Sequence, residues 1–362
     1  MYRFTPFLMI FTGIALSLAM SGCSADRISG NVEVIDICNF KELPWEELPE
    51  DVRSPEYIRL SPGEDGVILG GIDDIKIAGG KIYVQDWRNK RIAVFGMDGK
   101  GMRSLVRYGR GPGEYLNISA FDVDGEGNIF VVDGTSDRLL VYDTAGVCTR
   151  DEKLPFEIEI IKIIDPDNYL LALCSWENGP FAGTQLMRSD SLLNKKEEIS
   201  RYTEYVDSNY WLSSSYFVTS ADRIFFQKQV NDSVYCFNNA GTPEKIYLFD
   251  FGNATVPLEM RRDLEKAAES GELNRYTTLI EFTVIGNRYI YGTIREKGGP
   301  VMFIADKEAR TLYKLPVRES GRYGVFRGCS SGVLISYLLP GIPGDPYPER
   351  EEDFLLALYK VK

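Results

Sequence analysis

Histidine is absent from this sequence of 362 residues, which narrows the chemistry that the protein can perform. A Ser-His-Asp triad, a Cys-His pair and a histidine-ligated zinc or iron centre all require that side chain. Carboxylates remain available for acid/base catalysis, and tyrosine and arginine can serve as a base and as a neutraliser of charge. Acidic, phenolic and guanidinium side chains are therefore the catalytic candidates that we weigh.

Two aspartates are the first carboxylates to consider. Asp86 and Asp133 end two similar segments, IYVQD and IFVVD, each of which is predicted to be a strand. Side-chain oxygens at such a position commonly accept hydrogen bonds from the turn that follows. Because a catalytic residue has no reason to recur in each copy of a repeat, we expect a structural role for both.

Two further motifs imitate ligand sites. The segment DVDGEGNIFVVD (122–133) resembles a calcium loop, but it lacks the closing glutamate and no helices flank it. GRGPGEY (109–115) resembles a phosphate loop, but Pro112 has no N–H and a strand follows where a helix is needed. We expect no cofactor, calcium being unsupported, and we expect Glu114 and Tyr115 to lock a tight crossing of the chain.

Aromatic and arginine side chains offer a different kind of site. Aromatic rings with polar edges stack on sugars, and the forked guanidinium group binds hydroxyls and carboxylates, so together they suit a glycan and an acidic one in particular. Packing inside the fold is the alternative role for each ring. The candidate ligand-binding residues, all in segments predicted to be loops or to border them, are Trp87, Arg88, Arg110, Trp176, Tyr210, Trp211, Arg275 and Arg295.

An internal repeat shows which elements must position these residues. Residues 72–100 and 118–147 align almost residue for residue. Their spacing of about 46 residues is typical of one four-stranded blade of a β-propeller. Alternating apolar residues and glycine turns predict the strands of the first blade at 73–78, 81–86, 91–95 and 104–107.

Later units diverge but keep this pattern. The second strand recurs as YLLALC (169–174), RIFFQK (223–228), RYIYGTI (288–294) and VLISYL (333–338). The sequence therefore predicts an all-β, six-bladed β-propeller of four-stranded blades over residues 56–362. The sixth unit lacks its outermost strand, and we expect EYIRL (56–60) to supply it, which closes the ring and removes exposed edges.

The blade register also sorts the connections by face. Connections between second and third strands, and those between blades, emerge on one face and include nearly all long segments; we call it the long-loop face. The other connections are short and rich in Gly-Gly and Asp-Gly, and they define the short-turn face. Loops on a rigid scaffold commonly carry function, so the long-loop face is the candidate binding face. There, residues 255–270 are predicted to form one helix that begins at Thr255.

A family resemblance rests on the repeated segments. VQDWRNKRIAVF (84–95) and VVDGTSDRLLVY (131–142) are similar to NHL-type blades. With GRGPGEY and the final LALYKVK (356–362), they resemble six-bladed β-propeller lipoproteins of Bacteroidota. The resemblance implies the fold but no single activity, since propellers serve as binding platforms, scaffolds and enzymes. The missing histidines disfavour a zinc-dependent amidating lyase, one NHL-type enzyme.

The N-terminus is predicted to lie outside the fold. Residues 1–22 match a signal peptide, because Arg3 precedes an apolar run that is too short to span a membrane. The following Ser21-Gly22-Cys23 resembles the lipobox of bacterial lipoproteins, which implies cleavage before Cys23 and its acylation. An ordinary signal peptide with a chance cysteine is the alternative. Residues 23–55, rich in proline and acids, are expected to be the lipidated cysteine and a tether, in an outer-membrane lipoprotein.

The net charge bears on the class of binding partner, and the number and spacing of the cysteines bear on their pairing. The formal net charge is −12 and no segment concentrates basic residues, so a nucleic-acid partner is not expected. The cysteines beyond Cys23 are odd in number and lack CxxC spacing. We expect most of these cysteines to be small buried side chains, and their disulfide pairing stays open. They are Cys38, Cys148, Cys174, Cys236 and Cys329.

These observations favour a membrane-anchored, non-catalytic binding propeller that captures a glycan or a partner protein of the cell envelope on its long-loop face. The competing hypothesis is a hydrolase or polysaccharide lyase, lactonase-like, that uses carboxylates, tyrosine and arginine. A structural subunit of an outer-membrane complex is a third hypothesis.

Overall fold

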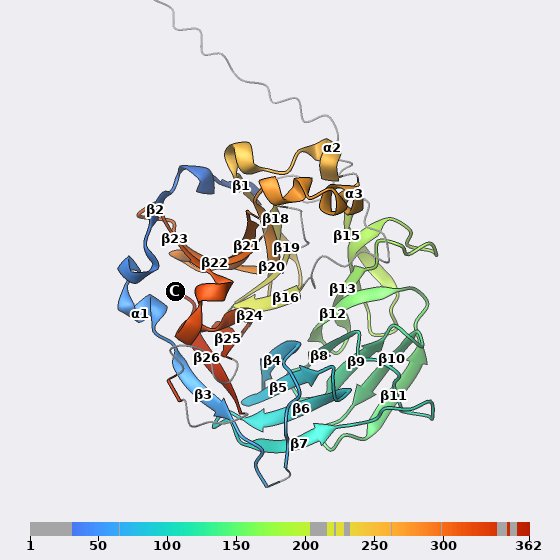
Figure 1. The fold of residues 1–362 in the computed structure, drawn as a ribbon. Helices are drawn as coiled ribbons and strands as arrows, with labels where there is room; N and C mark the ends of the chain where they lie inside the picture. Colours follow the sequence, from blue (N-terminus) through green and yellow to red (C-terminus); the bar gives the residue numbers. More distant parts are fainter. Residues whose placement is uncertain are drawn as a thin grey trace, which may run out of the picture.

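The protein is a six-bladed β-propeller, as predicted (Figure 1). The structure is a computed structural model, and it describes residues 31–64, 66–202, 216–220, 222–227, 232–261, 263–297, 299–338, 346–347 and 353–362. In each blade four antiparallel strands follow one another outward, and the first strands of the blades gather around the axis.

The first three strands of blade 1 lie within one residue of those predicted, whereas the fourth begins at Gly101, three residues before the predicted 104–107. Blade 1 contains β4 (Asp74–Ala78), β5 (Lys81–Asp86), β6 (Arg91–Gly96) and β7 (Gly101–Leu105). Blade 2 contains β8 (Ala120–Val123), β9 (Ile129–Asp133), β10 (Arg138–Tyr142) and β11 (Cys148–Lys153). Blade 3 contains β12 (Ile158–Asp165), β13 (Asn168–Leu173), β14 (Thr184–Ser189) and β15 (Lys195–Arg201).

The diverged blades keep the same order. Blade 4 contains β16 (Tyr216–Ser220), β17 (Arg223–Gln227), β18 (Ser233–Asn238) and β19 (Pro243–Phe249). Blade 5 contains β20 (Thr278–Ile285), β21 (Tyr289–Glu296), β22 (Gly299–Asp306) and β23 (Thr311–Pro316). Blade 6 contains β24 (Val325–Ser330), β25 (Val333–Leu338), β26 (Phe354–Lys360) and β3 (Glu56–Leu60).

The core lies between the blades. Second and third strands are covered on both faces by neighbouring blades, so β5 and β9 are buried along nearly their whole length. Ile82 of blade 1, for example, shares one buried cluster with Ile335 of blade 6. Each blade therefore depends on the next one around the ring for its burial.

The ring closes as the sequence predicted. β3 pairs antiparallel with β26, so that Leu60 lies opposite Phe354 and Glu56 lies opposite Leu358. The last blade is thus built from both ends of the chain, which protects the outer edge of β26 from pairing with other chains.

The expected tether is wrong for the residues from 32 to 55, which lie against the propeller. β1 (Val32–Ile35) adds a parallel strand to the outer edge of blade 4, and β2 (Lys41–Leu43) adds one to blade 5. α1 (Glu50–Arg53) then leads into β3, so this strap, residues 32–55, runs along the outside of three blades (Figure 1). Its prolines and acids suggested a flexible spacer, but buried apolar residues anchor it: Ile35, Ile37, Trp45, Leu48 and Val52.

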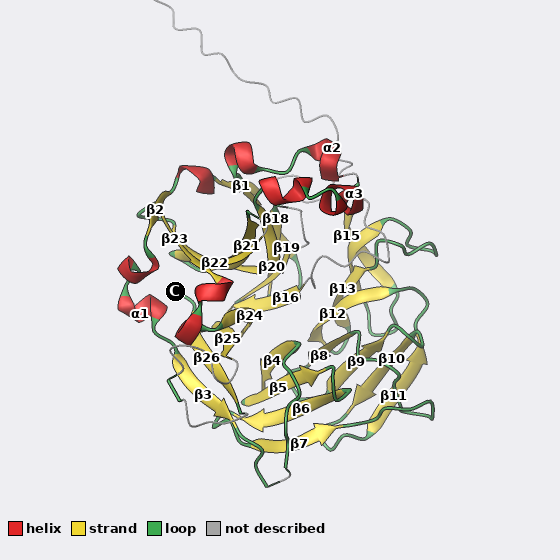
Figure 2. Ribbon diagram, in the orientation of Figure 1, coloured by secondary structure: helices red, strands yellow, loops and turns green. Residues whose placement is uncertain are grey.

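The predicted single helix over 255–270 is also wrong. Figure 2 shows short helices there, α2 (Leu258–Arg261) and α3 (Leu264–Glu269). The carboxylate of Asp263 accepts a hydrogen bond from the N–H of Lys266 and begins α3, whereas Thr255 ends the short 3-10 helix Gly252–Ala254. A second N-cap inside the apolar pattern divides the segment. Across the described parts of the chain, no helix is long and apolar enough to cross a membrane.

The five cysteines within the described residues form no disulfide. Cys174, Cys236 and Cys329 are buried, as expected for most of them, and burial raises the pKa of Cys236 to about 11. Cys38 is exposed and Cys148 is partly exposed, so the expectation holds for three of the five.

Candidate functional site

The two faces of the propeller differ as the sequence predicted. Long connections on the long-loop face include residues 106–119 between blades 1 and 2, 174–183 within blade 3 and 250–277 between blades 4 and 5. On the short-turn face the connections shrink to two residues at 79–80 and at 331–332. The fold therefore provides a rigid scaffold with elaborated loops on one side.

Buried carboxylates hold the long loops on this scaffold by accepting hydrogen bonds from them. Asp86 is fully buried and accepts hydrogen bonds from the N–H of Gly70, at 2.9 Å, and from the amide of Asn89, at 2.7 Å. Asp133 does the same in blade 2, where it accepts from the N–H of Leu116 at 2.7 Å. The predicted structural role of both aspartates is confirmed, since each joins the loop of its own blade to the preceding crossing.

The same task is performed in blade 3 by a residue that sequence reasoning missed. Glu177 is buried within the loop 174–183 and accepts a hydrogen bond from the N–H of Glu157 at 2.7 Å. It lies after the strand end instead of at it, which hid the correspondence with Asp86.

The crossing GRGPGEY is locked by the two residues predicted to lock it. The Glu114 carboxylate accepts a hydrogen bond from the N–H of Gly111 at 2.7 Å. The Tyr115 hydroxyl donates to the carbonyl oxygen of Lys90 at 2.9 Å, and burial raises the pKa of this phenol to about 12. In the calcium-like segment, Asp124 accepts hydrogen bonds from Glu126 and Asn128, so its oxygens serve a turn.

Three loops of blade 1 come together and expose a set of aromatic, apolar and cationic side chains. The Trp87 side chain is 62% exposed, and the backbone N–H of Trp87 donates to the Asp73 carboxylate at 2.7 Å. Tyr108 is 53% exposed, and the Lys90 ammonium lies 3.7 Å from the centre of its ring. We call this set, all on the long-loop face, the blade-1 patch: Ile68, Trp87, Arg88, Lys90, Tyr108 and Arg110.

Within the described part of the chain, exposed aromatic rings lie only on the long-loop face. Among the described residues they are Trp87, Tyr108, Trp176 and Tyr347, and each lies on a connection of that face. The large apolar side chains exposed in turns of the opposite face are aliphatic, namely Met97, Val147 and Leu192. Aromatic rings that bind sugars or proteins need such exposure, whereas a packing role would have buried them.

The other predicted binding residues are distributed over the same face. Trp176 is 42% exposed in blade 3, and its indole N–H donates to the Glu157 carboxylate. Arg275 ends an exposed turn between blades 4 and 5, and Arg295 lies half-buried opposite Thr278 near the end of β21. The structure thus places Trp87, Arg88 and Arg110 on adjoining loops of blade 1 and leaves these three elsewhere on the face. Tyr210, Trp211 and Cys23 lie outside the described residues.

Charged residues on the innermost strands were missed altogether. The axial ion pairs are Asp74 with Lys76 at 3.0 Å, Asp122 with Lys162 at 2.8 Å, and Glu281 with Arg327 at 3.4 Å. Burial raises the pKa of both Asp74 and Glu281. The available signal was a lone charge within an apolar strand, as in TLIEFTVI. Asp74 and Lys76 share β4, but the partners of the other two pairs come from strands far apart in the sequence.

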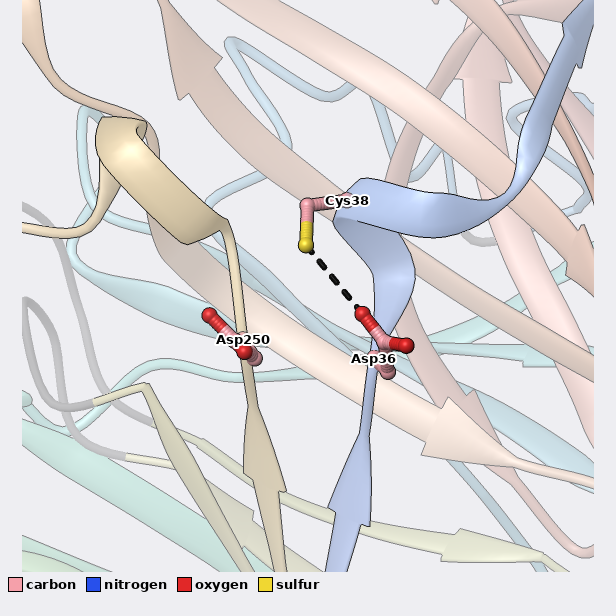
Figure 3. Close-up of side chains that lie close together, drawn as sticks. All are labelled: Asp36, Cys38 and Asp250. Carbon is pink, nitrogen blue, oxygen red and sulfur yellow. Dashed lines mark hydrogen bonds between the residues drawn. The ribbon is translucent and has the colours of Figure 1, made fainter.

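A cysteine and two aspartates meet where the strap joins blade 4 (Figure 3). Oxygen and sulfur atoms of Asp36, Cys38 and Asp250 lie within 4.8 Å of one another. The thiol of Cys38 donates to Asp36 at 3.1 Å, which raises the pKa of the thiol, and Asp36 also accepts from Asn39 at 2.8 Å. The neighbouring carboxylates therefore favour the protonated thiol, which is the less reactive form of the cysteine.

Fold and site together define a six-bladed β-propeller with a single elaborated, aromatic-bearing face. Within that class, the chain belongs to the family described as Domain of unknown function (DUF4934), which matches residues 32–328. The match begins with β1, so the strap is part of the family's domain. No curated protein matches the sequence.

Solved structures share the fold. A protein of Bacteroides fragilis described as exported is similar with a TM-score of 0.70 and 17% identity, over 91% of this chain and 100% of that one. A member of the DUF4221 family from Bacteroides vulgatus has a TM-score of 0.54 and 10% identity, over 85% of this chain and 97% of that one. At these identities the likeness concerns the fold alone.

Proposed function

We propose that this protein is a membrane-anchored binding protein of the cell envelope that captures an acidic glycan on its long-loop face. The lipobox-like Ser21-Gly22-Cys23 supports the anchor. The structurally similar Bacteroides fragilis protein is described as exported, which is consistent with this location. The protein would act by binding and not by catalysis.

The observation that carries the proposal is that the exposed aromatic rings of the described residues lie on one face. Trp87 and Tyr108 lie on neighbouring loops of blade 1, which hydrogen bonds of Asp86 and Tyr115 hold in place. Such rings offer flat surfaces for stacking on sugars with little loss of side-chain freedom on binding. Trp176 extends this aromatic character to blade 3.

Charge favours an acidic ligand. The blade-1 patch contributes the cations Arg88, Lys90 and Arg110, although the whole chain has a net charge of −12. Two carboxylates contact this loop: Asp86, which is buried and accepts several hydrogen bonds, and the exposed Asp73, which accepts from the backbone N–H of Trp87. The three cations of the patch outnumber them. Excess positive charge at this patch would attract carboxylates or sulfates and repel further cations.

The test is the binding of purified protein to an acidic polymer, polygalacturonate, and to a neutral one, dextran. We expect polygalacturonate to bind more tightly and the binding to weaken with salt. Trp87→Ala with Tyr108→Ala should lower the affinity about tenfold or more, as stacking of each ring contributes about 1 kcal/mol. Leu192→Ala, which removes an exposed side chain of the short-turn face, is the matched control.

Specific outcomes of this assay would contradict the proposal or select another hypothesis. If polygalacturonate does not bind, or if the patch variant binds it as well as the control does, the proposal is wrong. Cross-linking from position 87 that captures an envelope protein instead of glycan would select the partner-protein hypothesis. Release of unsaturated sugar ends during the same assay would select the lyase hypothesis, and stable co-purification with outer-membrane proteins would select a structural subunit.

A further inference from the structure

The strap begins with an exposed apolar surface on the outer edge of blade 4. Val32 and Val34 of β1 are each 56% exposed, and Leu248 of β19 is 39% exposed. In the parallel pairing of these strands, Val34 lies opposite Leu248 and Val32 lies opposite Ile246. Paired residues of neighbouring strands, and alternate residues of one strand, lie on the same face of a sheet. The three exposed side chains therefore form one strip, which we call the edge strip: Val32, Val34 and Leu248.

The edge strip lies on the side of blade 4 that faces blade 3. Ile246, on the same face of β19 as Leu248, shares a buried cluster with Leu186 and Ile199 of blade 3. Ile35, the residue after Val34 in β1, points to the other side of the sheet and is buried with residues of blade 5. The apolar face of blade 4 thus continues without interruption from the buried core to an outer edge that water reaches.

Few charges protect this edge. An exposed sheet edge normally carries charged side chains that keep it from pairing with other chains. The outermost strands of blades 2 and 3 have such sequences, CTRDEK in β11 and KKEEISR in β15. β1 is VEVI, and its single charged residue, Glu33, is paired with Lys245 at 2.7 Å. Within the described part of the chain, no strand pairs with the outer edge of β1. An apolar edge of this kind indicates a surface that another molecule covers.

The covalent chain limits how far the edge strip can lie from the membrane anchor. Residues 24–31 are all that separates Cys23 from Val32, so these two residues lie at most about 32 Å apart even in a fully extended chain. The amide of Asn31 donates to the carbonyl oxygen of Glu244 at 3.3 Å, which holds the end of this segment beside the start of β19. A membrane that holds acyl chains at Cys23 is therefore within reach of the edge strip.

We propose that the edge strip rests on the lipid surface of the membrane that carries Cys23. Its apolar side chains enter the boundary between headgroups and acyl chains, where the burial of apolar surface stabilises the contact. The backbone groups on the outer edge of β1 stay among headgroups and water, since the acyl region offers them no hydrogen-bond partners. The strip adds a second membrane contact to the lipid anchor, which strengthens attachment. This inference rests on the membrane anchor of the proposed function and is independent of its glycan site.

Contact between position 34 and lipid tests the inference. Val34→Cys is made in the full-length lipidated protein together with Cys38→Ser and Cys148→Ser, because these two native thiols are not buried. The protein is incorporated into phosphatidylcholine vesicles, some of whose lipids carry a nitroxide quencher, and a fluorophore is attached at position 34. We expect the quencher to reduce its fluorescence. Val147→Cys in the same background is the matched control, since Val147 is 55% exposed on a turn of blade 2 and its fluorophore should stay unquenched.

The labelling rate with a water-soluble thiol reagent gives a second measure. Val34→Cys in vesicles should react about tenfold more slowly than the same variant with Cys23→Ser in lipid-free buffer, because the burial of one apolar side chain supplies a factor of this size. Val147→Cys should react equally fast in both. If Val34→Cys fails to fold, Leu248→Cys replaces it on the same strip with the same expected results.

Mass spectrometry of Cys23 separates the failure of this inference from the failure of the proposed function. If Cys23 is lipidated and the fluorophore at position 34 is quenched no more than the one at position 147, the inference is wrong and the proposed anchor stands. If Cys23 carries no lipid, the anchor is wrong and the inference falls with it. Slow labelling without quenching also overturns the inference. It selects a second copy of the chain if the protection increases with protein density in the vesicles, and another segment of this chain if it persists in the Cys23→Ser form.

Discussion

The indole ring of Trp45 packs edge-on against the phenol ring of Tyr323, with ring centroids 5.6 Å apart. Trp45 belongs to the strap, and Tyr323 lies on the connection between blades 5 and 6. The carbonyl oxygen of Tyr323 in turn accepts hydrogen bonds from Ser336 at 2.7 Å and from Tyr359 at 2.9 Å. One aromatic contact thus links the strap to two strands of the closing blade.

Replacing Trp45 should destabilise the whole propeller. Its side chain is 2% exposed, and Trp45→Ala should lower the free energy of unfolding by about 3–5 kcal/mol. Its indole nitrogen is buried with no hydrogen-bond partner, so Trp45→Phe loses mainly volume and should cost about half as much. Urea unfolding followed by circular dichroism measures both. A loss under about 1 kcal/mol for Trp45→Ala would mean that the strap is not part of the cooperative fold.

Ring closure can be tested at a pair of glycines. Gly99 has a φ of +79°, and a Cβ added to it would lie 2.0 Å from the carbonyl oxygen of Arg59 in β3. Gly80 has a φ of +69° and nothing within 4 Å of such a Cβ. Gly80→Ala should therefore cost about 1 kcal/mol from backbone conformation alone, and Gly99→Ala clearly more because it separates blades 1 and 6. Equal thermal unfolding temperatures for the two variants would contradict this closure.

The propeller fold could be predicted because its pattern of strands and turns repeats along the chain. The strap and the axial ion pairs could not, because no repeated sequence pattern marks them. Two similar units fixed the blade length, and counting strands then assigned residues 56–60 to blade 6. The strap was missed because Ile35, Trp45 and Leu48 follow no strand or helix period amid prolines and acids. The pairing of Glu281 with Arg327 joins residues of different blades, which a pattern within one strand cannot reveal.

The same contrast holds for the candidate site. Trp87, Arg88 and Arg110 were predicted from residue type and loop position, which the blade register supplies. Lys90 and Tyr108 were missed because their contact depends on how closely two loops approach, which only the folded crossing determines.

Alkaline stability should depend on Tyr115. Burial raises the pKa of this phenol to about 12, whereas the unfolded chain ionises it near 10. Its contribution to stability is therefore complete below pH 10 and is lost as the pH rises toward 12. Tyr115→Phe should lose about 1 kcal/mol at pH 8 with its hydrogen bonds, yet decline less steeply above pH 10.

Tyr108→Phe is the matched control for this pH dependence. Lys90 lowers the pKa of the exposed Tyr108 phenol. Removing the Tyr108 hydroxyl should therefore not flatten the decline of stability between pH 10 and 12. Denaturant unfolding at several pH values gives the comparison. Parallel curves for Tyr115→Phe and the unaltered protein would show that Tyr115 ionises as readily in the fold as outside it.

The reactivity of Cys38 should be set by Asp36. The carboxylate accepts the hydrogen bond of the thiol, and this contact is the main cause of the raised pKa of Cys38. Since the thiolate is the reactive form, Asp36→Asn should speed labelling by a thiol reagent several-fold at pH 8. Asp250→Asn removes only a weaker charge effect and should change the rate less. Peptide mapping identifies the labelled cysteine, with buried Cys236 and Cys329 expected to react only after unfolding. An unchanged labelling rate in Asp36→Asn would mean that exposure, and not this carboxylate, limits the reaction.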